Sequence, residues 1–394
     1  MAVPFFTTTR QNKEIEAELL EAIRRTFEHG QFILGREVEA FEKQIAEYLG
    51  AGYAVGVSSG SDALVLILKA LDIGPKDAVI TTPFTFFATA SSIVRVGATP
   101  VFVDIDADSF NLSYRRLEEF LESCERNGDG RPIDPKSGKV IRAVILVHLF
   151  GLAAGAQKFV ELCDRFGLHL VEDVAQAIGT KDISPDGLKF CGTFGVAAAF
   201  SFFPTKNLGC AGDGGLVITD DETVAGAVRA LRDHGQWKRY VFEKLGLNAR
   251  LDAIQAAILS VKLKHLDSYN ARRRDLAALY RTLFARYGLD GTVVLPKAPG
   301  PPELHSYHQF VIRTPARDEM REFLAGKRIG TAVYYPLPLH LQPVFRHFGY
   351  SAGDAPESER AANEVLALPI FPELSRQEVE EVVGAIAEFF EAKK

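Results

Sequence analysis

Between residues 50 and 220, short apolar runs alternate with amphipathic helical patterns, and this alternation constrains the fold more than any other feature. Several runs are apolar at every position, which is typical of strands covered on both faces in a mostly parallel sheet. The seven candidate strands are residues 53–57, 78–81, 100–105, 143–147, 168–172, 197–203 and 215–219. The helical patterns between them include residues 61–71, 113–124 and 156–166. The sequence therefore predicts an α/β fold with one doubly wound sheet.

The length of the chain predicts a second unit. A chain of 394 residues exceeds the roughly 250–300 residues that one hydrophobic core usually supports. A long helical pattern runs from Leu251 to about Tyr287, and we place the boundary along it, near residue 265. This divides the chain into a large domain, residues 1–265 with the N-terminal segment, and a small α+β domain, residues 266–394. The patterns that indicate the small domain are residues 305–314, 317–329 and 377–392.

Composition argues against several function classes. A net charge of −6 and a pI near 5.9 disfavour a nucleic-acid partner. The first twenty residues lack the basic region followed by an apolar region that predicts a signal peptide, and no uncharged apolar run reaches the roughly 18–20 residues of a membrane helix. We therefore expect a cytoplasmic protein with no membrane partner. Neither a disulfide framework nor a metal site is expected, because the cysteines are scattered without a CxxC pair: Cys124, Cys163, Cys191 and Cys210.

One polar stretch interrupts the alternation. Residues 125–140, "ERNGDGRPIDPKSGKV", are rich in Gly, Pro and Asp, and the apolar strand pattern resumes directly after them. This composition predicts an exposed hairpin or loop insertion within the large domain.

The stretch "VSSGSDAL", Val57 to Leu64, places small residues between a strand and a helix. Ligands of doubly wound sheets bind at the carboxyl ends of the strands. Free backbone N–H groups at a helix start, beside Gly60 and Ser61, form an anion site suited to a phosphate. An ordinary helix N-cap by Ser59 or Ser61 explains the pattern equally well.

Two carboxylates follow a candidate strand in "VEDVAQAIG", Val171 to Gly179. Glu172 and Asp173 point to opposite sides if the strand persists, so only one needs to face a ligand. An ionised Asp173 in that position can pair with a protonated ring nitrogen and make the ring an electron sink. Gln176 lies about one turn further on. The alternative is that Asp173 is a helix N-cap.

A single lysine ends the strand in "SFFPTKNLGCAGDGG", which begins at Ser201. Apolar neighbours and a cationic cofactor would disfavour the ammonium form of Lys206. The neutral amine can form a Schiff base with an aldehyde, and once free it can act as a general base. The alternative is a solvated loop lysine. A fourth stretch, "LGLNARLDAIQAAIL", places Asn248 and Arg250 before the long helical pattern, where a cap and a surface residue are common.

Taken together and in this order, the four stretches resemble the nucleotide-sugar aminotransferases of the DegT/DnrJ/EryC1/StrS family, which depend on pyridoxal 5'-phosphate (PLP). The similarity runs from residues 30–50 to residues 366–374. The resemblance implies the fold type I aminotransferase architecture, with a seven-stranded large domain and a smaller C-terminal domain. It also implies PLP as the cofactor and a homodimer as the working assembly.

The resemblance assigns roles to the polar residues at the strand ends. Lys206 matches the Schiff-base lysine of the family, and Asp173 matches the partner of the pyridine nitrogen. Gln176 matches the residue beside the phenolic oxygen of PLP. The catalytic pair expected from the family is therefore Lys206 and Asp173.

Further cofactor contacts follow from the same resemblance. Gly60, Ser61 and Ser201 match phosphate-binding positions, and Asn248 matches a residue that reaches the phosphate from the other subunit. Active sites shared across the interface would make the two-fold dimer obligatory for function. Phe86 sits where an aromatic ring stacks on the cofactor, although a core helix phenylalanine is the alternative.

The resemblance indicates fewer candidates for contact with the substrate than for contact with the cofactor. Residues 331–343, "TAVYYPLPLHLQP", resemble the family segment that shapes the sugar pocket, which makes Tyr335 and His340 candidates. Arg250 is a candidate for a bidentate contact with a carboxylate of the donor or of a uronic acid. Lys238 and Arg239 are candidates for contact with a diphosphate through their positive charges. The alternative for both is a solvated turn.

The sequences of residues 203–215, "FPTKNLGCAGDGG", and 334–343, "YYPLPLHLQP", most resemble the branch that aminates 3-keto sugars, such as UDP-2-acetamido-3-keto-glucuronate and dTDP-3-keto-6-deoxyhexose. The implied activity is transfer of an amino group from an amino acid, L-glutamate, to C3 of a nucleotide-linked keto sugar for amino-sugar, lipopolysaccharide or other polysaccharide biosynthesis. The alternatives are a 4-keto aminotransferase, a PLP-dependent sugar dehydratase and a non-catalytic PLP-binding regulator. The related dehydratases carry histidine in place of Lys206, which argues against the dehydratase.

Overall fold

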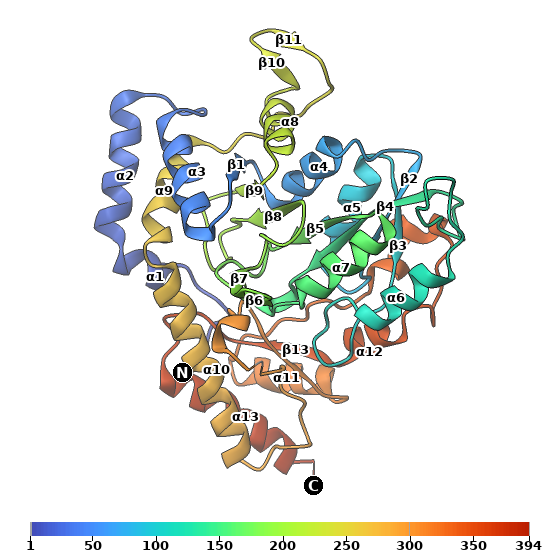
Figure 1. Cartoon of the computed structure of the whole chain (residues 1–394). Helices are drawn as coiled ribbons and strands as arrows, with labels where there is room; N and C mark the ends of the chain where they lie inside the picture. Colours follow the sequence, from blue (N-terminus) through green and yellow to red (C-terminus); the bar gives the residue numbers. More distant parts are fainter. Residues whose placement is uncertain (1, 299, 394) are drawn as a thin grey trace.

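A seven-stranded sheet lies at the centre of the computed structural model, which describes residues 2–298 and 300–393 (Figure 1). Its strands, in the order in which they neighbour one another, are β1 (Tyr53–Val57), β9 (Gly215–Thr219), β8 (Ala197–Ser201), β5 (His169–Asp173), β4 (Val140–Val147), β2 (Asp77–Thr81) and β3 (Thr99–Phe102). Strand β9 runs antiparallel to both its neighbours, and the remaining pairs are parallel. Each of the seven predicted strands is present, and the predicted mostly parallel sheet is confirmed.

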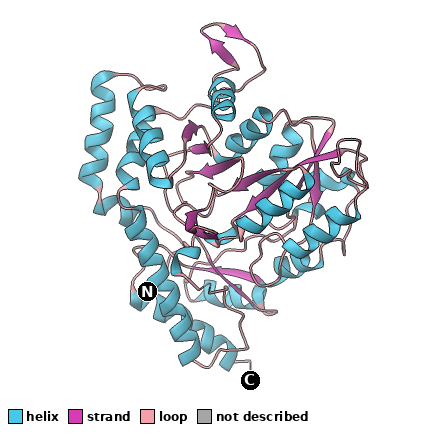
Figure 2. Ribbon diagram, viewed as in Figure 1, coloured by secondary structure: helices cyan, strands magenta, loops and turns pink. Residues whose placement is uncertain are grey.

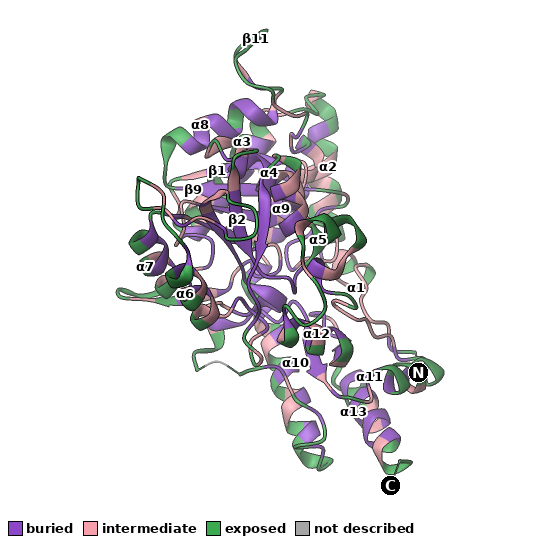
Figure 3. Cartoon of the chain, turned by 90° about the vertical axis from the view of Figure 1, so that its right-hand side faces the viewer, coloured by how far each residue is buried: buried purple, intermediate pink, exposed green. Residues whose placement is uncertain are grey.

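Helices cover both faces of this sheet (Figure 2). Successive residues of a strand point to opposite faces, and because these strands are apolar on both faces, each face must be covered. In β1, for example, Val55 and Val57 pack into one buried cluster and Ala54 into another. The helices of the first face are α4 (Gly60–Ala70), α5 (Phe87–Arg95) and α8 (Glu222–Arg232). Those of the second face are α3 (Arg36–Leu49), α6 (Tyr114–Ser123), α7 (Ala156–Phe166) and α9 (Ala253–Leu263). Figure 3 shows the buried strands inside and the exposed helix surfaces outside.

The long helical pattern after Leu251 forms two helices, α9 and α10 (Leu266–Arg286). The backbone tightens between them, where the N–H of His265 donates to the carbonyl of Lys262 at 3.0 Å. The break lets Leu259 and Leu266 pack against the sheet while the later turns of α10 pack into a separate core. The domain boundary near residue 265 falls at this break and stays a prediction.

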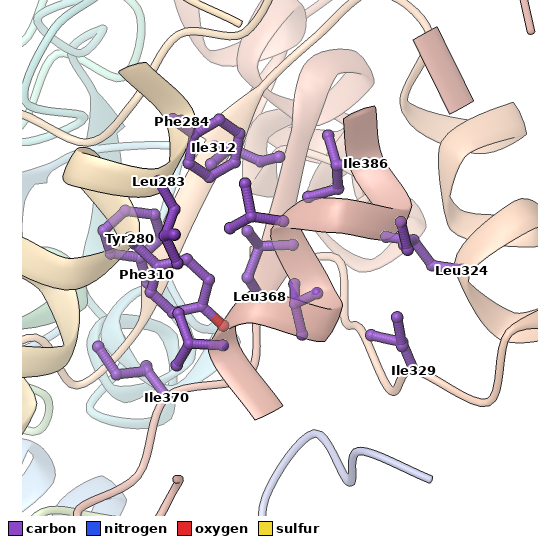
Figure 4. Packing of buried hydrophobic residues seen from close by; sticks show 14 of the residues in the cluster. Tyr280, Leu283, Phe284, Phe310, Ile312, Leu324, Ile329, Leu368, Ile370 and Ile386 are labelled. Atoms are coloured by element: carbon purple, nitrogen blue, oxygen red, sulfur yellow. The ribbon is translucent and has the colours of Figure 1, made fainter. Parts of the chain in front are cut away.

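The C-terminal region has its own core (Figure 4). Its antiparallel strands are β12 (Phe310–Arg313) and β13 (Val365–Leu368), and its helices include α11 (Arg317–Gly326), α12 (Pro356–Glu364) and α13 (Arg376–Glu391). Aromatic rings of α10 and β12 stack there, with the centroids of Tyr280 and Phe310 4.6 Å apart. The beginning of the chain joins this core, since Val3 pairs with Ile329. Two further helices, α1 (Thr9–Glu14) and α2 (Glu16–His29), lead from there to α3.

Two hairpins and the 125–140 insertion lie outside the main sheet. The hairpin β10 (Gln236–Lys238) and β11 (Val241–Phe242) projects away from the body in Figure 1. We call residues 234–248, which include it, the arm. The other hairpin is formed by β6 (Lys181–Ser184) and β7 (Gly187–Phe190).

The insertion, predicted to be exposed, is only partly so. Isolated bridges from Arg126 to Pro132 and from Ile133 to Val140 give it a hairpin-like course. Asp134 is buried and accepts a hydrogen bond from the amide of Ser137 at 2.9 Å. Separately, no helix among residues 2–298 and 300–393 combines the length and apolar character that a membrane crossing requires.

Candidate active site

A cavity of about 430 Å³ opens at the carboxyl ends of β1, β5 and β8. Segments far apart in the chain meet there because parallel strands end at the same edge of the sheet. The residues singled out in the sequence that line it are Gly60, Ser61, Phe86, Asp173, Gln176, Ser201, Lys206 and Tyr335. The structure thus brings the proposed catalytic pair and most of the proposed cofactor residues into one cavity.

The start of α4 forms one wall. Ser59 is the N-cap, and its Oγ accepts a hydrogen bond from the amide of Asp62 at 3.1 Å. The first hydrogen bond along the helix runs from Ala63 to the carbonyl of Ser59, so the amides of Gly60 and Ser61 precede it. The N-cap alternative is therefore correct for Ser59, and it leaves the neighbouring amides for an anion.

A close backbone approach explains Gly60. A Cβ on this residue would lie 2.7 Å from the Cβ of Ser201, so a larger side chain would push α4 away from the end of β8. Glycine at this position keeps the amides at the helix start beside the Ser201 hydroxyl. This cradle fits a phosphate group.

Asp173 is buried at the end of β5. Its carboxylate accepts hydrogen bonds from the Thr89 hydroxyl at 2.8 Å and from the amide of Ala175 at 3.1 Å. Burial raises the pKa of Asp173, while these two donors and the charge of Lys206 lower it. The donors therefore favour the ionised form in a site that would otherwise neutralise it.

The neighbouring carboxylate of Glu172 points to the other side of the sheet, as the strand geometry predicted. It is buried and accepts from the ring Nε2 of His148 at 3.0 Å. The amide of Ala154 donates to Nδ1 of the same ring, which places the imidazole proton on Nε2. Glu172 also accepts from the backbone amides of Gly192, Phe194 and Gly195. Asp173 alone of the two carboxylates lines the cavity.

Lys206 lies in the loop that follows β8, where it is half-buried in the cavity wall. Desolvation lowers the pKa of Lys206 to about 8, although the charge of Asp173 acts in the opposite direction. The neutral amine is therefore far more accessible near neutral pH than for a solvated lysine. The expectation of a solvated loop lysine does not describe this side chain.

Gln176 and Tyr335 form a second polar wall. The amide of Phe150 donates to Oε1 of Gln176 at 2.8 Å, and Nε2 of Gln176 donates to the Tyr335 hydroxyl at 3.0 Å. Because that hydroxyl is an acceptor here, its own proton remains for a ligand in the cavity. Phe86 lies opposite, with its ring centroid 6.2 Å from that of Tyr335. Phe86 is 56% exposed, so it is not a core residue.

Five predicted residues do not line the cavity of their own chain. Asn248, Lys238 and Arg239 are exposed on the arm. Arg250 pairs with Asp233 at 3.1 Å, beside the end of β1. His340 is buried and bonded to Glu359 through Nε2 at 3.1 Å. The ligand roles of these five residues stay predictions.

The cavity also contains residues that the sequence reasoning missed. His308 and Gln309 line it from the C-terminal region, and Thr89 holds Asp173 from behind. His308 lies outside the large sheet, so it does not follow any of the strand ends at which site residues were predicted. Thr89 lies one helical turn beyond Thr85 in "FTFFATA". This spacing of two hydroxyl residues is the feature of the sequence that could have indicated Thr89.

The donor set fits PLP. A buried carboxylate can face the pyridine nitrogen, an amine of lowered pKa can meet the aldehyde, and the cradle of α4 can hold the phosphate. These three groups line the same cavity.

Comparison with known proteins settles the family. A family model described as the DegT/DnrJ/EryC1/StrS aminotransferase family matches residues 13–387. The chain belongs to this family. The predicted resemblance and the predicted architecture are both confirmed.

Relatives within the family are similar over almost their whole length. A "Pleiotropic regulatory protein" of Geobacillus stearothermophilus is 44% identical over 99% of each chain. A protein of Acidithiobacillus ferrooxidans named UDP-N-acetyl-3-dehydro-alpha-D-glucosamine 3-aminotransferase is 40% identical over 98% of this chain and 97% of its own. A crystal structure of a family aminotransferase from Brucella abortus superposes with a TM-score of 0.90 at 36% identity, covering 98% of this chain and 99% of that chain.

The contact between Thr89 and Asp173 leads to a testable prediction. Replacing Thr89 with valine keeps the side-chain shape but removes a hydrogen bond to a charged group, which is worth about 1.5–3 kcal/mol. The pKa of Asp173 should then rise further, and turnover should fall by roughly 10-fold or more. Steady-state kinetics of Thr89→Val would check this. Thr89→Ser keeps the hydroxyl and should retain most activity, and equal loss in both variants would contradict the role.

Proposed function

We propose that this protein transfers an amino group from an amino acid to C3 of a keto sugar that is linked to a nucleotide, with PLP as its cofactor. The observation that carries the proposal is the convergence of Lys206, Asp173 and the cradle of α4 on one cavity. When bound, PLP supplies a reactive aldehyde and a ring that takes up negative charge.

The protein contributes positioning and proton transfer. The Asp173 carboxylate would hold the pyridine nitrogen protonated, with Thr89 keeping that carboxylate ionised. The amides at the start of α4, with Ser61 and Ser201, would hold the phosphate. Once free, the Lys206 amine is near Asp173 and has a pKa of about 8, so it can take a proton at Nζ and return it near neutral pH.

The sugar position is supported by the relatives. The Acidithiobacillus relative is named as a 3-aminotransferase of a UDP-linked 3-dehydro sugar, and it is similar over almost the whole chain. We propose that the Tyr335 hydroxyl, which lines the cavity and accepts from Gln176, donates its proton in a hydrogen bond to such a substrate. L-Glutamate is proposed as the amino donor, and Arg250 as a candidate for its carboxylate. The alternative substrate is a 4-keto sugar.

A half-reaction screen tests the substrate. The pyridoxamine form of the enzyme should be mixed with UDP- and dTDP-linked 3-keto and 4-keto sugars, and recovery of the aldehyde form followed by absorbance. We expect the 3-keto sugars to restore it at least about 10-fold faster. Faster recovery with the 4-keto sugars would establish the alternative, and recovery with no sugar would reject the proposed acceptor class.

We also propose that the enzyme works as a homodimer in the cytoplasm, with each arm completing the partner's site. The arm supports this, since it projects from the body and carries Asn248, Lys238 and Arg239 (Figure 1). Large apolar side chains are exposed along it, with Tyr240 75% and Leu245 89% exposed. Apolar surface of this kind is typical of a protein interface.

The name of the Geobacillus relative supports a regulatory role as a second candidate. A regulator that merely binds PLP has no need of an amine with a lowered pKa beside a buried carboxylate. Lys206 and Asp173 provide both, which favours the enzyme. The same lysine argues against the sugar dehydratase.

A further inference from the structure

A chain of buried amide groups lies behind the cavity wall. The Asn270 side chain, on α10, donates from Nδ2 to the carbonyl of Ile178 at 3.1 Å. Its Oδ1 accepts from Nδ2 of Asn207 at 2.8 Å. Oδ1 of Asn207 in turn faces Nδ1 of His308 at 3.1 Å. Asn207, Asn270 and His308 are all buried, so each of these bonds is shielded from water.

The donors and acceptors in this chain run in one direction. Because Nδ2 of Asn270 is bonded to a carbonyl, its Oδ1 must be the acceptor for Asn207. Asn207 then presents its own Oδ1 to His308, so the imidazole must carry its proton on Nδ1. A second bond, from Nδ2 of Asn207 to the carbonyl of Ser306 at 3.3 Å, supports the same orientation.

Two members of this hydrogen-bonded chain, Ile178 and Asn207, belong to the two loops that carry the catalytic pair. Ile178 lies in the loop that follows Asp173, the last residue of β5, and this loop includes Gln176. Asn207 directly follows Lys206. The side chain of Asn270 therefore bridges the loop after β5 and the loop after β8 from behind.

A glycine makes room for this bridge. Gly179 has a φ of +78°, and a Cβ there would lie 2.4 Å from Nδ2 of Asn270. Any larger residue would displace the Asn270 amide and strain the backbone. Arg273, one turn further along α10, fixes the other end by donating to the carbonyls of Tyr307 and His308.

We propose that Asn207 and Asn270 are positioning residues, whose amide chain sets the distance and orientation between the Lys206 amine and the Asp173 carboxylate. This rests on the proposed function for its catalytic consequence, since neither asparagine lines the cavity. A buried hydrogen-bonded unit of this kind holds both loops in one arrangement, and small displacements of reacting groups reduce turnover strongly.

Asn207→Asp and Asn270→Asp test the proposal in the holoenzyme. Each keeps the side-chain size and removes the Nδ2 donor. In Asn207 this group bonds Asn270 and the carbonyl of Ser306, and in Asn270 it bonds the carbonyl of Ile178. We expect kcat to fall about 10- to 100-fold with the KM of both substrates changed by less than about 3-fold. For the double variant serine replaces both asparagines, because two aspartates would place carboxylates against each other across the 2.8 Å contact. This double variant should lose little more than either serine single variant, because the chain acts as a unit. Gly179→Ala should give the same pattern.

A second readout does not depend on activity. Hydrogen exchange measured by mass spectrometry should increase in both loops, at residues 176–182 and 203–209, in every variant. Each single variant carries its substitution on only one element, so a response in both loops shows that they are coupled. Val382→Ala, a core change in α13 that lies away from the cavity, is the matched control and should lower the melting temperature without changing kcat. If Asn207→Asp does not fold, Asn207→Ser removes the same donor without adding a charge.

Three outcomes would each overturn the proposal. The increase in hydrogen exchange could be confined to the loop that carries the substitution, or the losses of kcat could be additive in the double variant. The third is that Val382→Ala shows the same fall in kcat. Failure of the proposed function is distinguishable from these outcomes. In that case the unsubstituted enzyme would not aminate any nucleotide sugar, whereas the exchange experiment would still show whether the two loops are coupled.

Discussion

Lys206→Ala should abolish amino transfer, with kcat reduced by roughly 10⁴-fold or more. The substitution removes the only lysine amine that lines the described cavity. Both proton transfer and covalent attachment of the cofactor depend on that amine, and proton transfer alone contributes about 10²- to 10⁴-fold. Steady-state kinetics and the visible absorbance of the purified protein would measure the loss.

The control for this variant is Lys139→Ala, on the polar insertion. Lys139 is not among the cavity residues, so both the rate and the absorbance should stay at the level of the unsubstituted protein. Substantial turnover by Lys206→Ala would show that another group performs the proton transfer.

Asp173→Asn should reduce kcat by about 10²- to 10³-fold while the protein still folds. Asparagine keeps the shape and can still accept from Thr89, but it has no negative charge to stabilise a protonated ring nitrogen. Since the charge of Asp173 raises the pKa of Lys206, its removal should move that pKa further below about 8. Kinetics over a range of pH would report both effects.

Asp182→Asn is the matched control because Asp182 is also buried and accepts a backbone hydrogen bond, from the amide of Ala156 at 2.7 Å. It lies outside the cavity, so the variant should lose stability without losing turnover. An unchanged rate in Asp173→Asn would refute the assigned role of the carboxylate.

The fold was predictable from local patterns. Continuous apolar runs and alternating helices determine the seven strands, since strands buried on both faces need apolar residues at every position. The break between α9 and α10 was not predictable from periodicity. It arises because α10 leaves one core and enters another, which is a long-range property of the packing.

The candidate site was predictable where it uses strand ends. Asp173 ends β5, and Lys206 and the start of α4 lie in or after the segments that follow β8 and β1, so the sheet itself brings them together. Thr89 and His308 were not found, because a helix and a separate region place them there by tertiary packing. His340 lies outside the described cavity, where it is buried and bonded to Glu359, and its role as a substrate ligand stays a prediction.

The central claim is that Lys206 carries the cofactor in this cavity. Reduction of the holoenzyme with borohydride would fix a lysine–PLP bond permanently, and peptide mass spectrometry would locate it. We predict one phosphopyridoxyl group, on Lys206, in the peptide that contains "PTKNLG". The modification on a different lysine, or none on a protein that aminates sugars, would contradict it.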